Sequence, residues 1–182
     1  MKRLVILVAI AVLGTVDLPA DISLTVGSRQ AALIVQHTHF DPAVQLLSEL
    51  ELGAGGVWSL DPGARLRLGA GVSIGMIQRS ALLAGYRYRG VTTRSAWVSA
   101  GWTSRANVGF TVAGRAVAAS YELTTLLFFY PEIEAGPELT IFLGPHVRID
   151  WALPFFYQFR NDLDLAAGVA LRGSLGLEFR SP

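Results

Sequence analysis

The stretch ARLRLGAGVSIGM (residues 64–76) alternates without interruption between two kinds of side chain. Every even-numbered residue is apolar, and every odd-numbered residue is arginine, glycine or serine. A period of two residues places the two sets on opposite faces of a β-strand. Strands in soluble proteins are usually about five or six residues long, whereas a strand that crosses a bilayer at a tilt needs roughly 9–11. The pattern therefore predicts a membrane-spanning strand with one apolar face and one polar face.

The composition agrees with a membrane protein built from strands. The chain has 182 residues, of which 52% are hydrophobic and 16% are charged, whereas charged residues usually reach about 25% in a soluble domain. Beyond the N-terminal region there is no continuous apolar run long enough for a transmembrane helix. Hydrophobicity that is spread in alternation is typical of an outer-membrane β-barrel.

The N-terminus has the features of a secretory signal peptide over residues 1–20. Lys2 and Arg3 precede an apolar run from Leu4 to Leu13, which is too short to span a membrane but suits a signal-peptide core. Cleavage after Ala20 is preferred to cleavage after Gly14, and an uncleaved anchor helix is the alternative. Residues 21–182 are then expected to form one barrel domain, exported to the outer membrane of a bacterial cell.

Further segments repeat the alternation and bring the expected number of strands to eight. Residues 131–137 (PEIEAGP) interrupt the pattern, and residues 154–162 resemble an aromatic-rich connection. The predicted strands are 22–26, 44–60, 64–76, 96–102, 108–112, 121–129, 139–153 and 165–179. We therefore predict an all-β fold, an eight-stranded antiparallel up-and-down transmembrane β-barrel.

The chain combines a predicted signal peptide, a lack of cysteine, eight alternating strands and a final strand that contains Leu177 and Phe179. In this combination it resembles small outer-membrane β-barrel proteins of the OmpA/OmpX type. The resemblance covers residues 21–182 and lies in the pattern, without a diagnostic motif. It implies that the outer-membrane assembly machinery recognises the terminal aromatic residue, although residues 180–182 follow Phe179. Outer-membrane lipid is the other expected partner, and the sequence leaves the oligomeric state open.

The polar faces of the strands are expected to point into the barrel. The interior of an eight-stranded barrel is just wide enough for side chains to fill, and charges buried there must pair. A hairpin centred on His39 places Arg29 opposite Glu49, and one centred on Pro62 places Glu51 opposite Ser73. A structural ion-pair network is favoured over a path for ions or substrates. The predicted network comprises Arg29, Glu49, Glu51, Arg65, Arg67, Arg148, Asp150, Arg172 and Glu178, with Arg115 and Glu122 as further charged candidates.

Residues able to perform catalysis or bind a metal are sparse. His37, His39 and Asp41 alternate and could share one side of an extended segment that binds zinc or copper; an ordinary solvated loop is the favoured alternative. No histidine is followed two residues later by a serine, as in barrels that deacylate lipid A, so no catalytic residue is proposed. We expect no cofactor, and a net charge of +1 argues against nucleic acid as a partner.

The predicted function is a structural or surface role, or a narrow passive pore. Two alternatives remain: an OmpW-like barrel that passes small hydrophobic molecules through a dry interior opening sideways, and a soluble secreted lipocalin-like barrel whose apolar faces point inward. If the apolar face meets lipid, an arginine at Leu68 impairs insertion by about 2–4 kcal/mol, and a serine at Gly71 on the polar face has a mild effect.

Overall fold

The computed structural model describes residues 21–37, 40–61, 64–79, 91–121, 127–161 and 163–179. The predicted signal peptide, residues 1–20, lies outside this part of the chain, as does Glu122. No helix in the described ranges is long and apolar enough to cross a membrane.

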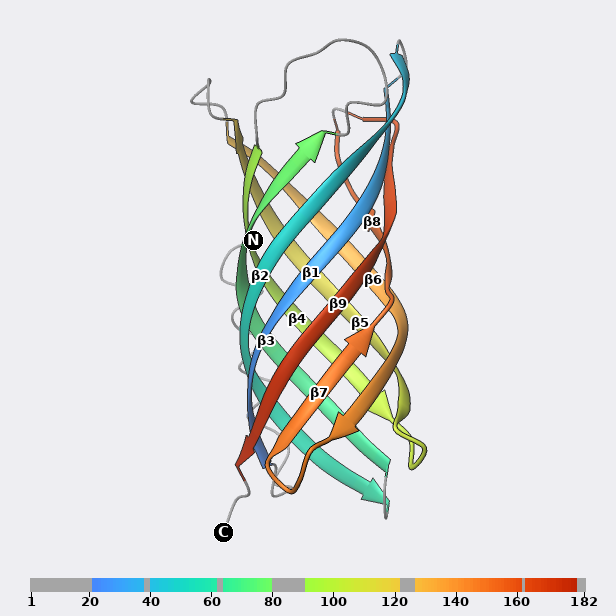
Figure 1. The fold of residues 1–182 in the computed structure, drawn as a ribbon. Coiled ribbons are helices and arrows are strands. Elements are labelled where there is room, and N and C mark those ends of the chain that lie inside the picture. Colours follow the sequence, from blue (N-terminus) through green and yellow to red (C-terminus); the bar gives the residue numbers. More distant parts are fainter. Residues whose placement is uncertain are drawn as a thin grey trace.

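The chain forms one antiparallel sheet that closes into a barrel (Figure 1). From β1 to β7 each strand pairs with the next in sequence, and the pairing of the first strand with the last closes the ring. The prediction of an up-and-down antiparallel barrel is confirmed. The strands are β1 (Asp21–His37), β2 (Phe40–Asp61), β3 (Ala64–Arg79), β4 (Val91–Thr103), β5 (Val108–Tyr121), β6 (Leu127–Phe142), β7 (Val147–Ala152), β8 (Phe155–Gln158) and β9 (Leu165–Phe179).

The short strands β7 and β8 together occupy one place in the ring. Both pair with β6 on one side and with β9 on the other, and the register continues unchanged from one to the other. Hydrogen bonds span the gap at Leu153 and Pro154: Leu153 N–H donates to the carbonyl of Pro137 (3.0 Å), and Ala170 N–H donates to the carbonyl of Pro154 (2.9 Å). The ring therefore has eight strand positions, as the sequence predicts.

The segment 131–137, predicted as a break, lies inside β6 instead. Its prolines, Pro131 and Pro137, are exposed on the outer wall, and their carbonyls accept hydrogen bonds from Phe159 and Leu153. The backbone N and O atoms of a strand residue face the same neighbouring strand. Proline has no N–H, so Pro131 lacks a donor opposite the end of β8, and Pro137 lacks one opposite the gap between β7 and β8. The neighbouring strand is interrupted at both points, which explains why a barrel strand tolerates these prolines.

Three other predicted boundaries also differ from the structure. The predicted sixth strand, 121–129, is divided between the end of β5 and the start of β6. The predicted seventh strand, 139–153, contains the turn at residues 143–146 that joins β6 to β7. The predicted connection, 154–162, contains β8.

The two ends of the barrel differ in their connections. At the lower end in Figure 1, which we call the turn end, residues 104–107 and 143–146 join neighbouring strands. Asn107 has a φ of 61°, in the left-handed region that asparagine tolerates in tight turns. At the opposite end, the loop end, residues 80–90 separate β3 from β4. Short periplasmic turns and longer extracellular loops are the rule in outer-membrane barrels.

The outer wall is apolar and the interior is polar or charged. Leu50, Leu52 and Val72 point outward and are 66%, 59% and 58% exposed. On β1 the exposed apolar residues run from Ile22 to Ile34, which corresponds to a band about 30 Å high for a rise of about 3.3 Å per residue and a tilt of about 40°. This matches the thickness of a bilayer hydrocarbon core. The lipocalin-like alternative is wrong, because it requires the apolar faces to point inward.

Candidate functional site: the charged interior

An apolar layer fills the interior at the loop end. Leu33 is fully buried in it, and on β1 it lies four residues beyond Arg29 toward that end. The alternation of the strands does not predict this layer, although runs such as AALIV (residues 31–35) carry apolar side chains on both faces. The layer consists of Ala31, Leu33, Val35, Leu47, Ile77, Val91, Val117, Ala119, Tyr130, Phe156, Ala166 and Ala170.

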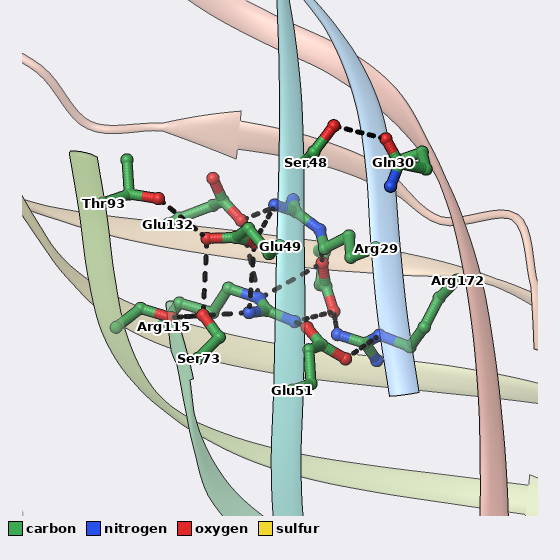
Figure 2. A network of polar contacts seen from close by, with 12 residues as sticks. Arg29, Gln30, Ser48, Glu49, Glu51, Ser73, Thr93, Arg115, Glu132 and Arg172 are labelled. Carbon is green, nitrogen blue, oxygen red and sulfur yellow. Dashed lines mark hydrogen bonds and ion pairs between the residues drawn. The ribbon is translucent and has the colours of Figure 1, made fainter. Parts of the chain in front are cut away.

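Beneath the apolar layer lies a set of buried ion pairs that we call the upper cluster (Figure 2). Its members come from five strands, and all of them point into the barrel. They are Arg29, Arg115, Arg172, Glu49, Glu51, Glu132 and Glu134.

Arg29 joins the apolar layer to the upper cluster. Its guanidinium carbon lies 4.6 Å from the ring centroid of Phe156. The same guanidinium donates to Glu49 over 2.9 Å and to Glu132 over 2.7 Å. Its side chain is only 1% exposed, so these carboxylates replace the water that a free arginine would bind.

Arg115 lies at the centre of the upper cluster, and its side chain is fully buried. It pairs closely with Glu51. Its nitrogen atoms also lie 3.7 Å from a carboxylate oxygen of Glu49, 3.6 Å from one of Glu132 and 3.4 Å from one of Glu134. One cation therefore balances carboxylates from β2 and β6, on opposite sides of β5 in the ring order.

The seam between the first and last strands brings two arginines face to face. Arg29 on β1 is the direct register partner of Arg172 on β9. Glu134 lies against both, 3.2 Å from Nε of Arg29 and in a close pair with Arg172. Glu51 adds a contact of 3.0 Å to Arg172. Like charges directly opposite each other destabilise a strand pair, so these carboxylates stabilise the seam.

A second set of ion pairs, the lower cluster, lies toward the turn end. Arg67 contacts Asp150 over 2.9 Å and pairs closely with Glu138. Arg148 lies 2.7 Å from Asp150 and 2.5 Å from Glu178. The lower cluster consists of Arg65, Arg67, Arg148, Glu138, Asp150 and Glu178.

The predicted registers are confirmed: Arg29 lies opposite Glu49, and Glu51 lies opposite Ser73. Every charged residue named for the predicted network lies in the barrel wall with an ion-pair partner, divided between the upper and lower clusters.

Sequence reasoning missed Glu132, Glu134 and Glu138, which all lie in β6. The alternation continues across residues 128–141 if the two prolines are counted as outward-facing residues. This pattern would have identified the three glutamates as inward-facing.

The candidate metal ligands lie in a part of the chain that the structure covers incompletely. His39 is outside the described residues, and the side chains of His37 and Asp41 are not described. In the ranges that the structure does describe, no three histidine, aspartate or glutamate side chains gather in a way that could hold a metal ion. The favoured solvated loop, and metal binding as its alternative, therefore both stay predictions.

Between the two clusters lies a cavity of about 90 Å³, bordered by Trp97, Thr25, Glu51 and Arg67. This volume exceeds the roughly 10–15 Å³ that a cavity needs to hold one water, so the cavity has room for more than one. The Trp97 ring lies across it against Gly53 and Gly71, where a Cβ would come within 2.5 Å of ring atoms. The glycines of β2 and β3 thus make space for this ring.

The mild effect expected for Gly71→Ser is contradicted by this packing. A Cβ at Gly71 would lie 2.1 Å from the carbonyl oxygen of Leu52 and 2.5 Å from Trp97. We expect Gly71→Ser to lower the free energy of unfolding by about 1–3 kcal/mol, as overpacking does. Urea titration of the barrel refolded in lipid vesicles measures the change. Gly101→Ser is the control, because a Cβ there comes no closer than 3.4 Å to its neighbours; equal losses in both variants would refute the packing argument.

A closed ring with an apolar outer wall and a charge-paired interior is the architecture of a small outer-membrane β-barrel. The structure is similar to Neisserial surface protein A (NspA), with a TM-score of 0.55 and 13% identity, covering 87% of this chain and 97% of that one. This likeness confirms the fold class.

Two further solved structures match this chain at lower similarity. The attachment invasion locus protein Ail of Yersinia pestis, solved with the heparin analogue sucrose octasulfate, has a TM-score of 0.48 and 11% identity, with 89% of this chain and 100% of that chain covered. OprG from Pseudomonas aeruginosa has a TM-score of 0.38 and 8% identity, with coverages of 90% and 98%. The sequence matches no protein-family model and no curated protein.

Proposed function

We propose that this chain is a closed barrel of the bacterial outer membrane, which conducts no solute and acts through the surface that it presents at the loop end. The observation that carries the proposal is the layered interior. An apolar layer, the upper cluster and the lower cluster follow one another along the axis, and their side chains are largely buried. A continuous water-filled path would have to break several buried ion pairs, at a cost of several kcal/mol for each uncompensated charge.

Two other functions receive less support. OmpW-like transport of hydrophobic molecules requires a dry interior with a lateral opening in the wall. Between β7 and β8 the wall stays closed, because backbone hydrogen bonds join this segment to β6 and to β9. Catalysis requires an activated nucleophile or a free acid or base. The carboxylates of both clusters are instead held by arginines, so the proposed function is not enzymatic.

The proposal is tested by current measurements on the chain refolded into planar bilayers. We expect no conductance steps from protein whose mobility on a detergent gel shifts on boiling, the sign of a folded barrel. Outer-membrane recovery with the same shift, after expression with the N-terminal segment, tests the location. Regular ohmic steps that scale with the amount of folded barrel would instead establish the narrow passive pore.

A further inference from the structure

Arg94 differs from every other charged residue of the barrel strands whose side chain the structure describes, because it points outward. Its neighbours Thr93 and Ser95 are buried in the interior, and Arg94 itself is exposed. The arginines of the upper and lower clusters all have carboxylate partners. Arg94 forms no ion pair or hydrogen bond with any part of the chain that the structure describes.

The surroundings of Arg94 are those of the outer wall near the loop end. Its register partners are Ile74 on β3, which is 54% exposed, and Ala118 on β5. Arg94 lies three residues from the first residue of β4, at the loop end. An arginine on a lipid-facing wall costs about 2–4 kcal/mol at mid-membrane and about 0–1 near the interface. Its long side chain can bring the guanidinium to headgroup level from this position.

Two hydroxyl groups lie on the same outward face, one step closer to the loop end. Thr92 and Ser120 are direct register partners, and the next outward pair is Arg94 with Ala118. Two residues along a strand correspond to about 7 Å, a distance that an arginine side chain spans. A guanidinium with two hydroxyl donors beside it matches a phosphate group, to which arginine donates in a bidentate fashion.

Toward the turn end, the wall beneath Arg94 is lined with small residues. Ala96 is the register partner of Ala116, and Val98 is the partner of Gly114. No heavy atom lies within 4 Å of the position that a Cβ would take at Gly114. On either side of Gly114 the exposed side chains of Val98 and Ile133 project outward from the wall. The result is a shallow apolar strip that begins below the guanidinium.

We propose that Arg94, Thr92 and Ser120 bind the phosphate group of an outer-leaflet membrane lipid, with one acyl chain lying along the strip at Ala116 and Gly114. The inference rests on the proposed placement in the outer membrane, with the loop end outside. The charge of the phosphate complements a cation that the rest of the described wall leaves unbalanced, and the strip is apolar as an acyl chain requires. A phosphorylated glycolipid such as lipid A has both parts.

The test measures retention of bisphosphorylated lipid A and of its dephosphorylated form by the full chain, folded in detergent and analysed by native mass spectrometry. We expect the wild type to retain the phosphorylated lipid preferentially. Arg94→Gln should weaken that binding by at least about tenfold, and Arg94→Lys should weaken it less. Gly114→Leu should weaken it by filling the strip. Arg105→Gln, in the turn at the opposite end, is the matched charge control and should bind normally.

Each variant is first checked for its boiling-dependent mobility shift and for insertion into bilayers. A wild-type chain that does not insert would refute the proposed function and this site with it. In folded, inserted barrels, unchanged binding by Arg94→Gln or equal retention of dephosphorylated lipid would refute the site alone. Competition by inorganic phosphate as effective as that by the lipid would assign the residues to a free anion and refute the lipid.

Discussion

Replacing Arg115 by leucine should lower the free energy of unfolding by about 3–5 kcal/mol, the usual cost of removing one partner from a buried ion pair. Arg115 is fully buried, and its guanidinium faces carboxylates of both β2 and β6. Its loss leaves the four glutamates of the upper cluster with only Arg29 and Arg172. We expect the deficit to shrink at acidic pH, because protonation of a glutamate removes one of the unbalanced negative charges.

Urea titration of the barrel in lipid vesicles measures this effect, with Arg65→Leu as the matched control. The Arg65 side chain is 31% exposed and pairs only with Glu178 among the acidic residues that the structure describes, so its loss should cost about 1 kcal/mol or less. The double variant Arg115→Leu/Glu51→Gln should recover part of the stability, since it removes one unbalanced carboxylate. Equal losses at Arg115 and Arg65, with no recovery in the double variant, would contradict the central role of Arg115.

A second large effect is expected on the outer wall, where Leu50→Arg should reduce folding stability in the bilayer by about 2–4 kcal/mol. Leu50 is 66% exposed. Its register partner Ser28 lies halfway between Ile22 and Ile34, the limits of the apolar band on β1. An arginine at this depth places its charge near the middle of the hydrocarbon layer, beyond easy reach of either interface.

The same substitution at Val108 provides the comparison. Val108 is 54% exposed but is the first residue of β5, directly after the turn of residues 104–107. We expect a cost there of about 0–1 kcal/mol. The depth dependence is read from urea titrations of both variants in vesicles, alongside their heat-modifiable mobility. If Leu50→Arg folds in buffer without lipid as well as the wild type, the outer wall does not face a membrane.

The outer wall and the hairpin registers could be predicted from the sequence because both depend on local signals. Strict alternation over residues 64–76 assigns each side chain to a face. The turn signal at Asp61-Pro62-Gly63 then fixes the partners of β2 and β3, which places Glu51 opposite Ser73. These inferences need no knowledge of the other strands.

The arrangement of β6 could not be predicted in the same way. A proline inside a strand normally indicates an edge or a break, and Pro131 and Pro137 are accommodated only because the next strand is interrupted opposite them. The interruption lies at Leu153 and Pro154, whose backbone hydrogen bonds go to Pro137 of β6 and Ala170 of β9, residues that no local pattern connects to them. Interpreting 131–137 as a break therefore removed Glu132 and Glu134 from the expected interior, and Glu138 fell between that break and the predicted strand 139–153.

The ion-pair partners and the apolar layer of the interior also could not be predicted from local sequence patterns. The partners Arg29 and Glu132 are separated by more than a hundred positions in the chain, and no short-range pattern joins them. The apolar layer was missed because Leu33 and Ile77 lie where both strand faces are apolar. A period of two disappears at such positions, so the inward face is not identifiable there.

The arginine pair at the seam has a consequence for the order in which the barrel forms. Arg29 and Arg172 repel each other where β1 meets β9, and the carboxylate of Glu134 on β6 lies against both guanidinium groups. Before the sixth strand is in place, the first hairpin offers Arg172 the carboxylate of Glu51 but not that of Glu134. The attraction between the two ends is therefore strongest once the sixth strand has delivered Glu134, so the electrostatics favour closure of the complete sheet over premature, smaller rings.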